Sequence, residues 1–104
     1  GYNGAVTEAG ALSKESFTAY PVGGLIYFSD NLEDAPQTVS MLSTMQDYAQ
    51  ETTGVGLFLS VDEEGGTVVR VSKYPAFRDT PFLSPQELYA QSGRSVCHWK
   101  YHWL

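Results

Sequence analysis

The sequence predicts an α/β fold with parallel strands, and three features of its first two thirds support that class. Two short apolar runs, residues 25–28 and residues 55–61, have the length and continuity of strands in a parallel sheet. Between them, apolar residues recur with helical spacing. Because parallel neighbours need a long crossover, usually a helix, this order predicts a right-handed βαβ unit.

A short helix is predicted before the first strand. Ser13 is of the type that caps a helix, and Leu12 and Phe17 stand at the two positions of a hydrophobic staple. Pro21 ends this helix, because proline cannot continue helical hydrogen bonding. The strand over residues 25–28 follows, and its unbroken apolar character predicts that both of its faces are covered.

The clearest helix lies between the two strands. Asp34 followed by Pro36 places an acid and a proline where a helix N-terminus favours them. Gly54 is the residue type usual just past a helix end. The apolar residues that repeat with helical spacing are Met41, Leu42, Met45, Tyr48 and Ala49.

In the last third of the chain, the sequence predicts an extended segment, a loop and a third helix. Residues 67–71 have the composition of a short extended segment, and residues 74–82 that of a loop with aromatic anchors. The third helix starts after Ser84, which caps it together with Glu87 in a capping box, while Pro85 occupies the first helical position. We expect this helix to end near Gln91, before Gly93.

Residues 94–104 differ in character from the rest of the chain. They hold its single Cys, both His and both Trp residues, and we interpret them as an atypical, non-native tail. Cys97, His98 and His102 have a spacing that would suit metal ligands on a helix, but no fourth ligand is fixed nearby. We therefore predict no metal site and no cofactor.

Composition narrows the classes of partner. A net charge of −6 over 104 residues argues against a nucleic-acid partner, which requires clustered Lys and Arg. No apolar run approaches the roughly 20 residues of a membrane span, so no membrane partner is expected. The acidic balance is compatible with a neutral sugar ligand. The composition does not decide between a bacterial cytoplasmic and an envelope or extracellular location.

The most informative segment is residues 57–70, in which an apolar strand ends abruptly in Asp62, Glu63 and Glu64 and then in two glycines. This pattern predicts a buried parallel strand that delivers carboxylates to the rim of a sheet. Ligands of α/β enzymes bind at the carboxyl ends of their strands. The segment is therefore the candidate binding site.

Residues 61–66, Val-Asp-Glu-Glu-Gly-Gly, followed by Arg70, resemble the Asp-x-Glu-Gly-Gly signature of the N-terminal domain of glycoside hydrolase family 3. Residues 20–28 and 31–32 resemble the preceding strand and exit loop of that family, in the expected order and at the expected distance. The resemblance is nearest to the bacterial β-N-acetylhexosaminidase branch and covers roughly residues 6–93.

This resemblance implies a (β/α)8 barrel, which typically needs about 250 residues. The chain has 104, so we expect residues 1–93 to be the N-terminal portion of such a barrel, followed by the tail at 94–104. A partial barrel leaves strand edges unpaired and apolar strands half covered. We therefore expect self-association of the fragment or a rearranged packing.

The resemblance also implies a role for each site residue. Asp62 would bind hydroxyl groups of the non-reducing sugar, Glu64, Gly65 and Gly66 would form the turn that shapes the pocket floor, and Arg70 would hold the acidic loop. A structural alternative for Asp62 is a rim carboxylate that caps a loop. For Glu63 and Glu64, a solvated or Arg-paired acid is the favoured interpretation.

No catalytic residue is assigned in this chain. On a strand, Asp62 and Glu64 would have Cα atoms roughly 6.6 Å apart, within the about 6.5–9.5 Å of inverting carboxylate pairs. The glycines break the strand at once, however, and the family's nucleophile and sugar-gripping segments are not found here; Asp30 and Asp79 lie in no matching motif.

The predicted function is therefore part of a retaining enzyme that hydrolyses terminal β-linked N-acetylhexosamine in oligosaccharides containing N-acetylglucosamine. The chain by itself is expected to be inactive. The alternative is a non-catalytic fragment that binds carbohydrate or self-associates.

Overall fold

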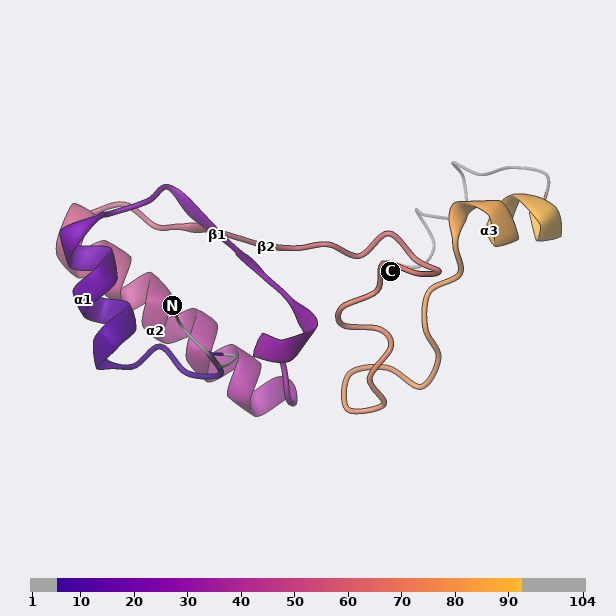
Figure 1. Ribbon diagram of the computed structural model, residues 1–104, viewed down its shortest axis with the longest axis horizontal. Coiled ribbons are helices and arrows are strands. Elements are labelled where there is room, and N and C mark those ends of the chain that lie inside the picture. The colour runs from indigo at the N-terminus through magenta and orange to yellow at the C-terminus, as the bar shows by residue number, and fades with distance from the viewer. Residues whose placement is uncertain (1–5, 93–104) are drawn as a thin grey trace. The chain divides into compact units, whose positions relative to one another are not determined.

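The computed structural model describes residues 6–92 and divides the chain into two compact units, Gly1–Asp62 and Glu63–Leu104. Within residues 6–92, the first unit contains four main elements and a short 3-10 helix, and the second contains one helix (Figure 1). In chain order these are α1 (Ala11–Ala19), β1 (Gly24–Tyr27), η1 (Ser29–Asn31), α2 (Ala35–Thr53), β2 (Phe58–Val61) and α3 (Pro85–Ser92).

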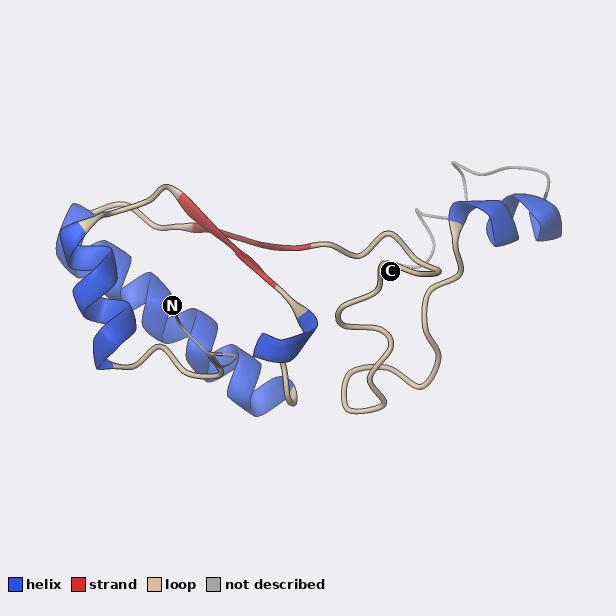
Figure 2. Ribbon diagram, in the orientation of Figure 1, coloured by secondary structure: helices blue, strands red, loops and turns tan. Residues whose placement is uncertain are grey.

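The two strands pair in parallel, and α2 connects them (Figure 2). The register places Gly24 opposite Phe58 and Tyr27 opposite Val61. The predicted order of strand, helix and parallel strand is therefore confirmed. Whether this unit belongs to a larger barrel stays a prediction, because two strands and their helix occur in several α/β architectures.

Local sequence explains both ends of α2. The Asp34 side chain caps the helix by accepting a hydrogen bond from the Gln37 N–H at 2.8 Å. At the other end Gly54 has φ 73°, the left-handed conformation that glycine adopts without a steric penalty. Both predicted boundaries are confirmed.

The core of the first unit forms where α2 meets α1 and the sheet. Its buried cluster consists of Ala9, Phe17, Met45, Ala49 and Leu57, with Leu25, Tyr48 and Leu59 packed against it. Burying apolar surface in this way is the main favourable term in folding. The predicted helical face of α2 thus faces the core.

Polar side chains of α2 also tie neighbouring segments to the helix. The Gln46 amide accepts from the Leu57 N–H and donates to the Leu57 carbonyl, each at 2.8 Å. The Tyr48 hydroxyl donates to the Ala9 carbonyl at 2.7 Å. These contacts position the chain that enters β2 and the chain that precedes α1.

The predicted cap of the first helix is wrong. Helix α1 begins at Ala11 with Gly10 as its N-cap, so Ser13 lies inside the helix. The first helical hydrogen bond runs from the Lys14 N–H to the Gly10 carbonyl at 3.1 Å and needs no side-chain cap. The helix does end before Pro21, as predicted.

The prediction that the strands are buried on both faces is also wrong. Leu25 and Leu59 pack against the core on one face, whereas Ile26 and Phe58 on the other face are 60% and 85% exposed. Side chains alternate along a strand, so one layer of helices covers only every second residue. The expected half-covered apolar strands are what the structure shows.

In the second unit, the capping box of α3 is confirmed. The Ser84 N–H donates to Glu87 Oε2 at 2.7 Å, and the Glu87 N–H donates to Ser84 Oγ at 3.2 Å. The helix continues to Ser92, one residue beyond the predicted end. Gly93 and the tail with Cys97, His98 and His102 lie outside the described residues.

Residues 67–71 do not form the predicted extended segment. The Glu64 N–H donates to the Val68 carbonyl at 2.9 Å, which closes a tight turn with a single bridge between Gly65 and Val68. Residues 74–82 form turns and irregular loop, as predicted. Within residues 6–92, no helix combines the length and the apolar character that crossing a membrane requires.

Candidate functional site

Asp62 lies directly after β2, at the carboxyl end of the parallel pair, and its side chain is exposed. It follows Phe58 and Ser60 at intervals of two residues, the spacing of side chains that share the uncovered face of the sheet. Within residues 6–92 its carboxylate forms no hydrogen bond or ion pair. Neither oxygen is therefore committed to a partner within the described part of the chain.

Glu63, the next residue, has a different environment. Its Oε2 accepts from the main-chain N–H groups of Arg70 at 3.0 Å and Val71 at 2.8 Å. Its Oε1 accepts from the Ser72 N–H at 3.4 Å and from the Ser72 hydroxyl. Backbone amides, including that of Arg70, and one hydroxyl satisfy this carboxylate, so Glu63 is not a freely solvated acid.

These contacts determine the protonation of Glu63. Partial burial of the carboxyl raises its pKa, whereas hydrogen bonds from the Ser72 hydroxyl and from the N–H groups of Val71, Arg70 and Ser72 lower it. The hydrogen bonds outweigh the burial, and the pKa of Glu63 lies below its ordinary value. Glu63 is thus a structural anion that organises residues 70–72.

Ser72 is the partner that the sequence analysis missed. Only 2% of it is exposed, and its hydroxyl donates to Glu63 while accepting from the Phe82 N–H at 3.1 Å. It therefore links the acidic segment to the chain that leads into α3. A serine in a long loop is too common to have been singled out without the fold.

The glycine pair allows a close backbone approach, as its sequence suggested. Gly65 has φ 82° and Gly66 has φ 65°, both in the left-handed region. The Gly66 N–H donates to the Phe82 carbonyl at 3.1 Å, and a Cβ added at Gly66 would lie 2.6 Å from Ser84 Cβ. A Cβ at Gly65 would collide with the Leu83 carbonyl oxygen. The two glycines therefore lie against Leu83 and Ser84 of the same chain, where a larger side chain would not fit.

Glu64 and Arg70 complete the set of predicted residues. The Glu64 side chain is exposed, and its main-chain N–H closes the turn to Val68. Arg70 binds the acidic segment through its main-chain N–H, which donates to Glu63. The role of Glu64 and of the two glycines in shaping a pocket floor stays a prediction.

The structure thus divides the predicted residues between the two units. Asp62 closes the first unit, and Glu63, Gly65, Gly66 and Arg70 belong to the second. Two adjacent acids therefore differ in environment: the Glu63 carboxylate is bound by backbone amides and a hydroxyl, whereas the Asp62 side chain is exposed. Among residues 6–92, no three His, Cys, Asp or Glu side chains gather closely enough to hold a metal ion.

Comparison with known proteins gives an informative similarity. No protein-family model matches the chain. It is 31% identical over 80 residues to a protein named Beta-hexosaminidase A from Pseudoalteromonas piscicida. The match covers 76% of this chain but 13% of that protein, so the chain spans a small part of its relative's length. This supports the coarser prediction of a glycosidase-like relationship and does not establish membership of family 3.

Proposed function

We propose that the chain is a segment of a β-hexosaminidase-like glycoside hydrolase of family 3, in which Asp62 binds hydroxyl groups of the terminal sugar. The observation that carries this proposal is the exposed carboxylate of Asp62 at the end of a parallel strand, inside the region of similarity. A match that covers 76% of 104 residues includes position 62 wherever it begins.

Carboxylate chemistry suits this role. An ionised carboxylate only accepts hydrogen bonds, and its two oxygens can serve two neighbouring hydroxyl groups. Hydrogen bonds to a charged acceptor are shorter and stronger than those between neutral groups. The Asp62 side chain is exposed, and no group within residues 6–92 binds its oxygens, so both remain for a ligand in this proposal. Glu63 does not offer this, because its oxygens already accept four hydrogen bonds.

The fold and reaction follow as parts of the same proposal. β1, α2 and β2 would form early elements of a (β/α)8 barrel, where binding residues lie at the carboxyl ends of the strands. The complete enzyme would release terminal β-linked N-acetylhexosamine with retention of configuration and without a cofactor. Since the chain spans 13% of its relative and contains no assigned nucleophile, it would bind sugar without hydrolysing it.

Calorimetric titration with N-acetylglucosamine tests the role of Asp62. We expect binding in the millimolar range and a loss of about tenfold or more for Asp62→Asn, because a hydrogen bond to a charged group contributes about 1.5–3 kcal/mol. Asp47→Asn is the matched control, since it makes the same change of side chain and charge at an exposed acid on α2 that lies outside the predicted site. Equal affinities for both variants would contradict the assignment.

A second measurement addresses hydrolysis. The chain should release no chromophore from 4-nitrophenyl N-acetyl-β-glucosaminide. Activity that disappears in Asp62→Ala would show that the catalytic machinery lies within these residues after all.

A specific observation also favours the second candidate, a self-associating structural fragment. Ile26 and Phe58 are 60% and 85% exposed. Parallel sheets are normally covered on both faces, and this one is covered on one. A second copy of the chain could bury these side chains, whether or not Asp62 binds a sugar.

A further inference from the structure

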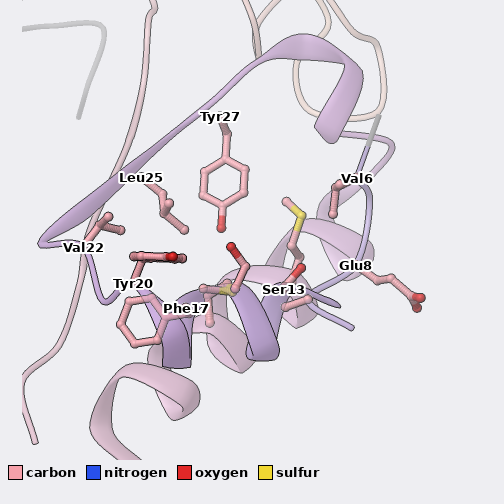
Figure 3. Close-up of a pocket in the computed structure, with 12 residues that line it drawn as sticks. Val6, Glu8, Ser13, Phe17, Tyr20, Val22, Leu25 and Tyr27 are labelled. Carbon is pink, nitrogen blue, oxygen red and sulfur yellow. The ribbon is translucent and has the colours of Figure 1, made fainter. Parts of the chain in front are cut away.

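The first unit contains a cavity that the proposed function does not use. It has a volume of about 340 Å³ and lies between α1, β1 and α2 (Figure 3). Its lining is predominantly apolar and includes Phe17, Leu25, Met41 and Met45, and Asp62 is not part of it. The pocket is open to solvent on one side, where Tyr20 and Val22 are 80% and 47% exposed, and its volume exceeds the about 150 Å³ of an apolar cavity that binds benzene.

Tyr27 supplies a polar group to this apolar space. It shares a face of β1 with Leu25, and Figure 3 shows its ring extending from the strand into the cavity. The hydroxyl oxygen is buried and has no hydrogen-bond partner among the residues that the structure describes. Burial also raises the pKa of Tyr27, so the group stays protonated at neutral pH and can donate.

Another tyrosine of the same unit offers a comparison. The Tyr48 hydroxyl, also partly buried, donates to the Ala9 carbonyl at 2.7 Å. Buried polar groups in native proteins nearly always have such a partner, because leaving one unsatisfied costs free energy. A donor directed into an apolar cavity of this size therefore points to a missing acceptor.

We propose that this cavity binds a small neutral molecule with an apolar body and one acceptor oxygen, to which the Tyr27 hydroxyl donates. An aryl or alicyclic ketone or ester has this chemistry. A carboxylate is disfavoured because Glu8 lines the cavity and the chain carries a net charge of −6. A sugar is disfavoured because many hydroxyl groups would meet an apolar lining. The proposal is independent of the sugar-binding role of Asp62.

The two methionines allow a direct test, because they are the only ones in the chain and both line the cavity. With the methionine methyl groups labelled with carbon-13, acetophenone and cumene are titrated against the full chain. These ligands have nearly the same shape, but a carbonyl oxygen in acetophenone replaces a methyl group in cumene. We expect both to shift both methyl signals, with the hydrogen bond favouring acetophenone.

Tyr27→Phe keeps the ring and removes only the hydroxyl, so the variant should fold. The ratio of the cumene to the acetophenone dissociation constant should fall about three- to tenfold in this variant, the effect of one hydrogen bond. Tyr89→Phe, in α3, removes a hydroxyl that does not line the cavity and should leave the ratio unchanged.

Two results would overturn the proposal. Methionine signals that neither ligand moves would show that the cavity does not bind such molecules. A ratio that is the same in Tyr27→Phe and in the unchanged chain would show that the hydroxyl does not recognise the carbonyl.

Discussion

Replacing Glu63 with Gln should release residues 70–72 from the acidic segment. In the native loop one carboxylate oxygen serves the N–H groups of Arg70 and Val71, and the other serves the N–H and hydroxyl of Ser72. A glutamine keeps one oxygen, but its NH₂ group must then face donors on the other side. At least one charge-assisted hydrogen bond is lost, and a buried donor is left unsatisfied.

The magnitude follows from these contacts. A hydrogen bond to a charged group contributes about 1.5–3 kcal/mol, and partial exposure of this carboxylate reduces the value. We therefore expect Glu63→Gln to destabilise the loop by about 1–2 kcal/mol. This corresponds to a roughly five- to thirtyfold larger equilibrium constant for opening of the loop. Glu64→Gln, at an exposed acid with the same change of charge, should shift stability by less than about 0.5 kcal/mol.

Amide hydrogen exchange measures this effect more directly than global unfolding, because the chain has two compact units and need not unfold in one step. The amides of Arg70, Val71 and Ser72 should be protected at pH 7 and should exchange faster in Glu63→Gln. Unchanged protection of these three amides, or an equal effect of Glu64→Gln, would refute the assignment of Glu63 as the organising anion.

The pH dependence of this loop has a definite sign. The pKa of Glu63 is lower in the folded chain than its ordinary value of 4.5, so the folded state binds protons less readily than the unfolded state. The stabilisation is therefore fully present above pH 4.5 and is lost as the pH falls through the lower, folded value. The difference between the unchanged chain and Glu63→Gln should shrink over that acidic range.

Three other substitutions test the fold and the uncovered face. Gly66→Ala should lower the free energy of unfolding in urea by about 1–3 kcal/mol, because Gly66 has φ 65° and the new Cβ would lie 2.6 Å from Ser84 Cβ. Gly23→Ala is the control, since a Cβ at Gly23 would meet open space. Phe58→Ser should weaken any concentration-dependent association in sedimentation, and Val39→Ser on α2, also exposed, should not. Asp34→Ala should cost about 1 kcal/mol of unfolding free energy, with reduced helicity by circular dichroism.

Secondary structure was predictable wherever short-range interactions decide it. The cap at Asp34, the left-handed Gly54 and the capping box of Ser84 and Glu87 each depend on contacts within about four residues. The failure at Ser13 has the same origin, because Gly10 satisfies the start of α1 three residues earlier without a side chain. A local sequence pattern predicts the presence of a helix more reliably than it predicts the first residue of that helix.

The candidate site was predictable only in part. The position of Asp62 at a strand end follows from an apolar run that stops at an acid, and the structure shows this carboxylate exposed. The partners of Glu63 were not predictable, because Arg70, Val71 and Ser72 approach it only after the glycine turn reverses the chain. Nothing in the sequence distinguishes an acid that binds solvent from an acid that binds backbone amides.

By itself, the amino-acid order determined the helices, the two strands, their parallel pairing and the glycine turn, because propensity, capping and side-chain periodicity act over a few neighbouring positions. Only the tertiary structure decided which strand face is covered, which of two adjacent acids remains accessible, and that the Tyr27 hydroxyl enters an apolar cavity. Those outcomes depend on how segments distant in the chain pack together. The packing decides which residues of a given type are buried and which hydrogen-bond partners they meet.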